Sequence, residues 1–181
     1  MKRILFPGFL VLVLLSASSC RNHRAATSTN NNTNTSATNQ KNKALQQKYA
    51  TLLAVESSDI SNIPLYAFID EWYGVPYKYG GKTKSGVDCS GLASNLYTQV
   101  FSKNISGSAA NLYSLCKPLG QDELKEGDLV FFKIDGNRIS HVGIYLQNGR
   151  FVHATTKRGV MINELKEEYY KKYYFKGGRL K

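Results

Sequence analysis

The spacing of hydrophobic positions changes near the middle of the chain. In the first half, apolar residues recur at helical spacing in segments that begin near Ala44, Pro64 and Cys89, which predicts three amphipathic helices. A shorter helix is expected over residues 109–116. Strands are expected over 129–134, 138–146, 151–156 and 159–162, then a helix over 164–173 and a short strand near Phe175. Helices followed by an antiparallel meander indicate an α+β domain over residues 44–181.

Residues 1–20 have the pattern of a lipoprotein signal peptide. Basic residues precede an apolar stretch of 12 positions, Ile4–Leu15, which is shorter than the roughly 20 residues that cross a membrane. Small residues and then Cys20 follow, so we expect Cys20 to carry a lipid and to become the first residue of the mature protein. The alternative is cleavage by an ordinary signal peptidase, with Cys20 incidental.

Residues 21–43 separate this signal from the domain. They contain 14 Asn, Ser or Thr residues and no aromatic or large aliphatic residue, so we expect a disordered tether between the membrane and the domain. Arg21 differs from the aspartate that retains many lipoproteins at an inner membrane. The sequence therefore favours a protein anchored by its N-terminal lipid at the outer membrane and facing the periplasm.

Composition narrows the choice of partner. Lys and Arg outnumber Asp and Glu by 24 to 13, and the net charge of +11 favours an anionic partner such as a lipid surface or an acidic envelope polymer. The clustered basic and aromatic motifs of nucleic-acid-binding folds are missing from the sequence, so no nucleic-acid partner is expected. A chain of 181 residues accommodates one domain with tails. We expect one active site and a monomer.

Two cysteines remain if Cys20 is lipidated. Cys89 and Cys116 could pair, since disulfides form in exported proteins. We favour free thiols, because a disulfide would block Cys89, the cysteine with the more reactive setting. Cys116 is expected on the apolar face of a helix, as an inert buried thiol.

The strongest chemical signal is Cys89. It begins a predicted helix, where backbone N–H groups and the positive end of the helix dipole favour the thiolate over the thiol. Gly80 and Gly81 allow a tight loop before it, and Gly91 leaves room for a substrate backbone beside the sulfur. Cys89 is therefore the predicted nucleophile.

A base for this thiol must come from His141 or His153, which lie on neighbouring predicted strands. A two-residue turn at Asn148-Gly149 would place the two imidazoles on opposite faces of the sheet. A three-residue loop over 147–149, with Gly149 left-handed, pairs residue 143 with His153 and places both rings on one face. We predict the second arrangement, because it lets His153 orient His141.

The predicted roles follow from this geometry. Cys89 attacks a carbonyl group, His141 moves the proton, and His153 fixes the tautomer of His141. The Cys89 backbone N–H and the Tyr77 hydroxyl are expected to hold the oxyanion. Asp88 is a candidate to bind a cationic amine of the substrate, and its alternative role is to cap the helix.

Four motifs together resemble the NlpC family of cell-wall cysteine peptidases, and the resemblance runs from about Leu65 to the C-terminus. They are Tyr77-x-Tyr79-Gly80-Gly81, Gly86-x-Asp88-Cys89-Ser90-Gly91, Glu126-Gly127-Asp128-Leu129-Val130-Phe131-Phe132 and His141-Val142-Gly143-Ile144-Tyr145.

The resemblance implies a papain-like fold, in which a helix bearing the cysteine packs on an antiparallel sheet. It implies hydrolysis of peptidoglycan stem or cross-bridge peptides by Cys89, His141 and His153, without a cofactor. Tyr77, Asp88 and Ser90 would then line the substrate groove. Many relatives carry an arginine after the cysteine helix, where this chain has Ile105-Ser106-Gly107-Ser108.

Several alternatives remain open. A Cys-His-His set could bind zinc, but the sequence offers no fourth ligand, so no metal is expected. A thiol amidase or an acyltransferase could use the same triad on another bond. A catalytically silent cell-wall-binding lipoprotein is a further alternative, which the complete triad disfavours. The cleaved bond could be a γ-D-glutamyl to diamino-acid link or a D,D cross-bridge.

Overall fold

The structure of the protein is a computed structural model, described here by residues 30–181, with side chains from residue 35 onward. The expected signal peptide over 1–20, the lipidated Cys20 and the first part of the tether, residues 21–29, lie outside the described residues.

Helices dominate the first part of the domain and strands the second. The helices are α1 (Asn30–Leu53), α2 (Ile63–Trp72), α3 (Cys89–Phe101), α4 (Ala109–Ser114) and α5 (Glu168–Tyr173). The strands are β1 (Lys82–Thr83), β2 (Gly86–Val87), β3 (Cys116–Leu119), β4 (Leu129–Phe132), β5 (His141–Tyr145), β6 (Arg150–Thr155), β7 (Gly159–Glu164) and β8 (Tyr174–Leu180). The predicted α+β class and the helix beginning at Cys89 are confirmed.

Six strands form one antiparallel sheet in the order β3-β8-β4-β5-β6-β7. The last strand, β8, lies between β3 and β4 and pairs Leu129 with Gly178 on one side and Cys116 with Leu180 on the other. Cys116 was expected on a helix, and that expectation is wrong, because α4 ends at Ser114. Strand β3 tolerates Pro118 because it lies at the sheet edge.

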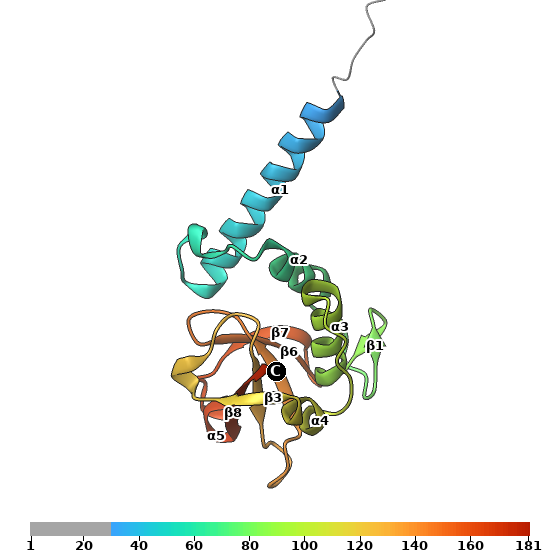
Figure 1. Ribbon diagram of the computed structural model, residues 1–181, viewed down its shortest axis with the longest axis vertical. Coiled ribbons are helices and arrows are strands. Elements are labelled where there is room, and N and C mark those ends of the chain that lie inside the picture. Colours follow the sequence, from blue (N-terminus) through green and yellow to red (C-terminus); the bar gives the residue numbers. More distant parts are fainter. Residues whose placement is uncertain (1–29) are drawn as a thin grey trace, which may run out of the picture.

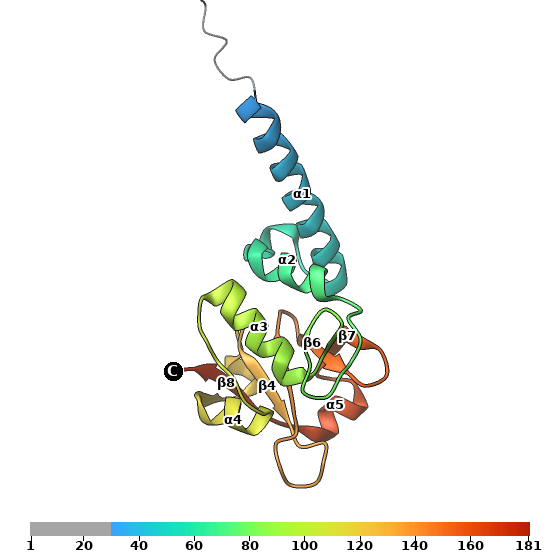
Figure 2. The same ribbon diagram turned by 90° about the vertical axis from the view of Figure 1, so that its right-hand side faces the viewer.

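Helix α3 covers one face of this sheet and packs against β5 and β6 (Figure 2). Leu92 and Leu96 of α3 belong to the same core as Val142, Ile144 and Val152 of the two strands, and all five side chains are buried. This packing fixes the first turn of α3, and therefore Cys89, over the middle of the sheet.

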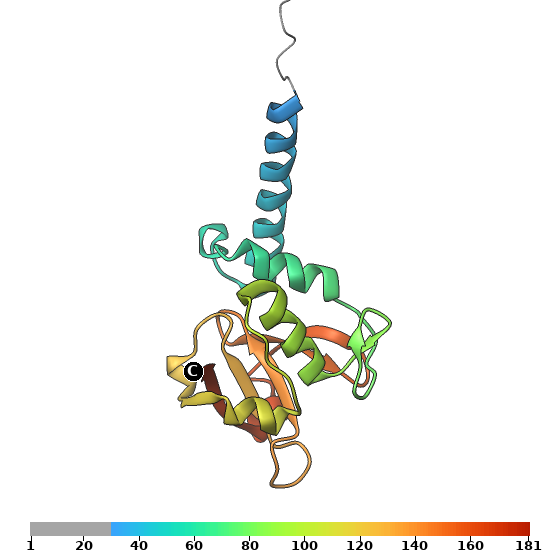
Figure 3. The same cartoon turned by 45° about the vertical axis from the view of Figure 1, so that its right-hand side comes forward.

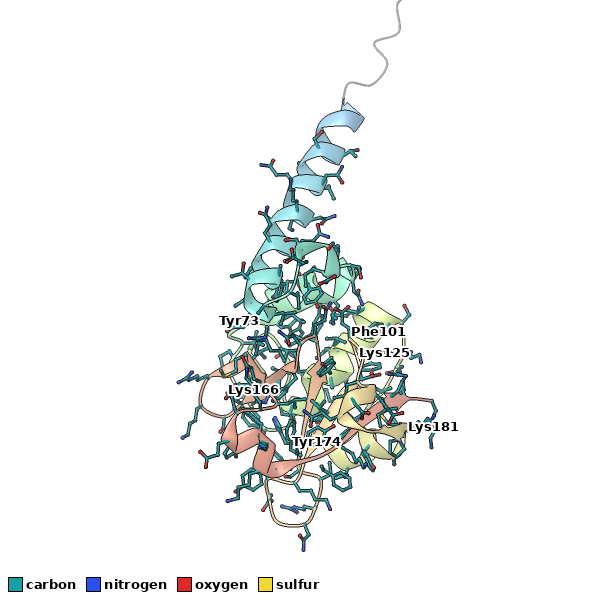
Figure 4. The ribbon with its side chains drawn as sticks, turned by 90° about the vertical axis from the view of Figure 1, so that its left-hand side faces the viewer. Tyr73, Phe101, Lys125, Lys166, Tyr174 and Lys181 are labelled. Carbon is teal, nitrogen blue, oxygen red and sulfur yellow. The ribbon has the colours of Figure 1, made fainter. Side chains whose placement is uncertain are left out.

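Helix α1 projects away from the domain as a long rod (Figure 1). It begins at Asn30, so residues 30–43 are helical where the sequence predicts a disordered tether. Tyr49, Ala50 and Leu53 anchor the C-terminal end of α1 in the core, while residues 35–41 are exposed (Figure 4). Extending a helix from an anchored end avoids the cost of nucleation, so polar residues can continue it. None of the helices within residues 30–181 is long and apolar enough to span a membrane.

The loop before Cys89 folds back on the start of α3. Its β1–β2 hairpin lies beside the first turns of the helix (Figure 3). The Asp88 N–H group donates to the Gly81 carbonyl oxygen at 3.1 Å. A methyl group at Gly91 would collide with the same carbonyl oxygen. The free space expected at Gly91 for a substrate is thus filled by the protein's own backbone.

We predict that Gly91→Ala destabilises the domain by about 2 kcal/mol, a typical cost of overpacking. The reason is that the collision involves a backbone oxygen, which cannot rotate away as a side chain would. Urea unfolding followed by circular dichroism would measure the change. Thr98→Ala, at an exposed position of the same helix, is the control and should change stability by less than about 0.5 kcal/mol. Equal stability of the Gly91 variant and the wild type would contradict the prediction.

Candidate active site

Asp88 caps the helix that carries Cys89. Its Oδ1 accepts hydrogen bonds from the Gly91 N–H at 2.6 Å and from the Ser90 hydroxyl at 2.9 Å. Its Oδ2 accepts from the Gly80 N–H at 2.8 Å. The capping role is confirmed. The same carboxylate lines the cavity beside Cys89, so binding of a substrate amine stays a prediction.

Burial decides the protonation state of Cys89. The side chain is free and the residue is 8% exposed. Burial raises the pKa of the thiol to about 11, although the N–H groups of Val142, Ser90 and Cys89 itself lower it. The helix start was expected to favour the thiolate, and that expectation is wrong for this closed site. The sulfur is a neutral thiol near pH 7 and needs a base to react.

The β5–β6 hairpin has the predicted register. Ile144 pairs with Val152 and Tyr145 pairs with Phe151, which leaves residues 147–149 as the loop. The turn itself differs from the predicted one, because Asn148 and Gly149 are both left-handed, with φ values of 51° and 71°, and the Arg150 N–H donates to the Gln147 carbonyl oxygen across them. The Leu146 N–H donates to the Arg150 carbonyl oxygen, and this extra residue on the β5 side keeps the predicted register. Continuing this register places His153 opposite Gly143, and a side chain at Gly143 would meet the Phe151 ring. Both imidazoles therefore project from the same face of the sheet.

The two imidazoles are joined directly. His141 Nε2 and His153 Nδ1 are 2.7 Å apart, and the ring centroids are 5.0 Å apart. Burial lowers the pKa of both rings below the ordinary value of 6.5, and for His141 the neighbouring His153 lowers it further. Both histidines are neutral near pH 7, so one ring donates the shared hydrogen bond and the other accepts it.

Cys89 and the histidines lie where two cavities meet. Cys89 lines a cavity of ≈ 560 Å³ together with Asp88 and Ser90, and the two histidines line a second cavity of ≈ 410 Å³. Tyr77, Asp135 and Ser140 line both. The Val142 N–H group points at the sulfur, so Cys89 lies beside the residue that follows His141. An extended substrate could fill both cavities and present its scissile bond between thiol and imidazole.

Tyr77 is placed to donate a hydrogen bond into this groove. Its side chain is half-buried and reaches both cavities. Burial raises its pKa, and the nearby Asp88 carboxylate raises it further, so the phenol keeps its proton near pH 7. Ser90 lines the groove too, but its hydroxyl proton is already donated to Asp88.

Sequence reasoning missed Asn163 and Tyr170. Asn163 Oδ1 lies 2.9 Å from His153 Nε2, and the Tyr170 hydroxyl lies 3.3 Å from the same nitrogen. The sequence contains a signal for Asn163. His153 pairs with Met161, so a strand continued by two residues brings Asn163 to the same face. The strand predicted over 159–162 ends one residue too early to include it.

The geometry disfavours the zinc alternative. The facing His141 and His153 nitrogens share a hydrogen bond and leave no space for an ion between them. Within the described residues no group of three or more His, Cys, Asp or Glu side chains is placed to hold a metal ion.

The loop over 105–108, where the resemblance to the NlpC family leads one to expect an arginine, has no basic side chain. Gly107 and Ser108 line the Cys89 cavity. Arg138 reaches the same cavity from the loop between β4 and β5, where it pairs with Asp135. A guanidinium group is therefore present in the groove, but it comes from a different segment.

The sequence matches one protein family and several known proteins. Residues 74–179 match the sequence profile of the NlpC/P60 family. The murein DD-endopeptidase MepS/murein LD-carboxypeptidase of Escherichia coli (strain K12) is 35% identical over 177 residues, 96% of this chain and 90% of that protein. The probable endopeptidase NlpC of the same organism is 39% identical over 113 residues, 62% of this chain and 73% of that protein.

A similar fold occurs among solved structures. The crystal structure of an NlpC/P60 family protein from Bacillus cereus ATCC 10987 matches with a TM-score of 0.61 and 25% sequence identity. The match covers 66% of this chain and 40% of that one, so this chain spans less than half of that protein. The predicted papain-like arrangement, a cysteine-bearing helix packed on an antiparallel sheet, is confirmed.

We predict that alkylation of Cys89 by iodoacetamide accelerates with pH far beyond neutrality. Because the pKa of the thiol is raised to about 11, the thiolate fraction should rise by about tenfold per pH unit between pH 8 and 10. Peptide mass spectrometry of a Cys116→Ala variant would measure the rate at Cys89 alone. A rate that levels off by pH 8 would show that the sulfur is already ionised there.

Proposed function

The chain belongs to the NlpC/P60 family, and we propose that it is a cysteine endopeptidase that hydrolyses peptide bonds of bacterial peptidoglycan with Cys89 as its nucleophile. The observation that carries this proposal is the hydrogen bond of 2.7 Å between His141 and His153 beside the start of the Cys89 helix. A nucleophile, a base and a group that orients the base are the parts that acyl transfer by a thiol needs.

In the proposed mechanism the proton moves together with the attack. Cys89 Sγ bonds to the carbonyl carbon while His141 takes the thiol proton. The C–N bond then breaks, and His141 returns the proton to the leaving amine, which leaves a thioester on Cys89. Water next gives a proton to His141 and attacks the thioester, and the proton returns to the sulfur.

The groove supplies the remaining roles in this proposal. The Cys89 backbone N–H and the Tyr77 phenol would stabilise the oxyanion. Asp88 would attract an ammonium group of the substrate, since the carboxylate borders the Cys89 cavity. Arg138 and Lys82 border the same cavity and would neutralise substrate carboxylates. A peptide that carries both amines and carboxylates suits such a lining.

We propose the D,D cross-bridge as the bond that is cleaved. Support comes from the murein DD-endopeptidase relative, whose match spans 96% of this chain and 90% of its own length. The γ-D-glutamyl link is the competing outcome. Both bonds release an amine on the His141 side, so the triad alone does not distinguish them.

Two other activities would use the site differently. An amidase would release stem peptides from the glycan, and an acyltransferase would need an amine in place of water in the second step. A silent cell-wall-binding protein would need none of the hydrogen bonds that join His141, His153 and Asn163. The intact chain of these bonds favours catalysis over binding alone.

The proposed location is the outer membrane, with the domain facing the periplasm and a lipid on Cys20. Helix α1 changes the expected reach of the active site. Its 24 residues form a rod of about 36 Å, and a rod keeps its length where a disordered tether fluctuates. The domain would thus be held at a set distance from Asn30, where the helix begins.

We predict that Cys89→Ala and His141→Ala abolish turnover of cross-linked dimeric muropeptides, because each removes a group that forms or breaks a bond. His153→Ala should retain part of the activity, since it only orients His141. Mass spectrometry of the products would identify the cleaved bond. Thermal unfolding of each variant would verify that the fold is retained. Undiminished cleavage by folded Cys89→Ala would overturn the peptidase proposal.

We predict that Cys20→Ala abolishes incorporation of a labelled fatty acid and moves the protein from the membrane fraction to the soluble fraction. Cys116→Ala is the matched control and should keep the label, because Cys116 is buried in the domain. Labelling that persists in the Cys20 variant would contradict the lipoprotein proposal.

A further inference from the structure

The hydrogen bonds of the site continue past the triad to a carboxylate. Asn163 Nδ2 donates to Glu167 Oε1 and Oε2, both at 2.9 Å. Glu167 lies just before α5, which packs beside β6 and β7 (Figure 2). Its Oε1 also accepts from the Glu164 N–H at 2.7 Å, which fixes the carboxylate on the turn after β7. One chain of contacts therefore runs from Glu167 through Asn163 and His153 to His141.

Each hydrogen bond in this series determines which group donates and which accepts in the next one. An ionised carboxylate only accepts hydrogen bonds, so Glu167 must face the amino group of the Asn163 amide. The amide oxygen then faces His153, which must carry its proton on Nε2. A neutral ring with Nε2 protonated has a lone pair on Nδ1, and this lone pair accepts from His141 Nε2. His141 Nδ1 is left without a proton.

We propose that Glu167 and Asn163 are positioning residues that select the reactive tautomer of His141 through His153. The inference rests on the proposed role of His141 as the base. With the opposite direction of donation, His141 would carry its proton on Nδ1 and could not take one there from the thiol. Neither Glu167 nor Asn163 touches Cys89, so both act through the histidines.

Among the groups around His153, Asn163 is the one that selects the tautomer of the ring. The Tyr170 ring packs edge-on against His153 at 5.1 Å, and its hydroxyl is 3.3 Å from Nε2 and 3.4 Å from Asn163 Oδ1. A hydroxyl can donate or accept, so Tyr170 adapts to either tautomer. The Asn163 amide has a fixed direction only because Glu167 faces its other end.

The test is reversal of charge at Glu167. In Glu167→Lys an ammonium group, which only donates, would attract the Asn163 oxygen and turn the amino group toward His153. Both histidines should then change tautomer. A wrong tautomer can cost a catalytic triad about 10⁴-fold in kcat, so we expect a loss of at least about 100-fold in kcat with little change in KM.

A second substitution that restores kcat would distinguish a reversed hydrogen bond from general damage to the site. Adding Asn163→Asp to Glu167→Lys replaces the amide by a carboxylate of the same shape, which can accept from His153 and pair with the lysine. We expect this double variant to regain most of the lost kcat. Glu167→Gln keeps an acceptor oxygen and should resemble the wild type. Glu168→Lys, an exposed neighbour with the same charge change, is the matched control and should retain activity.

Nitrogen-15 NMR of the imidazole rings gives a readout that does not need turnover. The proposal expects Nε2 protonated in both rings of the wild type and Nδ1 protonated in Glu167→Lys. If the lysine variant does not fold, Asn163→Ala takes its place in this test. It leaves the Glu167 carboxylate bonded to the Glu164 N–H, and it should give mixed tautomers.

Three results would overturn the inference. They are unchanged tautomers in the folded Glu167→Lys or Asn163→Ala variant, an equal loss of kcat in Glu168→Lys, and a folded double variant that regains nothing. Failure of the proposed function would look different, because a wild type inactive on muropeptides would still report its tautomers by NMR.

Discussion

The turn between β5 and β6 is the constraint on which the active site depends. A turn at Asn148 and Gly149, both left-handed, and one extra residue on the β5 side set the register that places His141 and His153 on one face. A loop shorter by one residue would send one ring to the other face and break the hydrogen bond between them. The same arrangement needs Gly143, since a larger residue there would meet the Phe151 ring. Backbone geometry thus determines whether His153 can orient the proposed base, His141.

Burial then determines how the site holds its protons. A helix start alone lowers the pKa of a thiol, but withdrawing the sulfur from water raises it by more at Cys89. The same withdrawal keeps both imidazoles neutral. The buried site therefore holds a neutral Cys89 thiol beside the neutral His141 imidazole. In the proposed mechanism attack and proton transfer occur together, and the orientation of the His141 lone pair then matters more than the charge of either partner.

The parts that were predictable from sequence are governed by local rules. The helix at Cys89 and the hairpin register follow from capping, turn chemistry and side-chain alternation among nearby residues. Insertion of β8 between β3 and β4 depends on pairing between segments far apart in the chain, and no local pattern specifies it. Asn163 was missed because strand ends are poorly defined by hydrophobicity. The raised pKa of Cys89 was missed because burial is a property of the assembled core.

The chain from Glu167 to His141 also solves an energetic problem. A carboxylate placed directly against His141 would orient the ring, but its charge would have to leave water at a cost of several kcal/mol. Glu167 instead lies in an exposed turn, where the charge stays hydrated. Only neutral groups, the Asn163 amide and the His153 ring, carry the orientation inward, and each has a hydrogen-bond partner on both sides. The exposed carboxylate can therefore fix the tautomer of the buried His141. A series of hydrogen bonds transmits the direction of donation from one group to the next without taking an ion out of water.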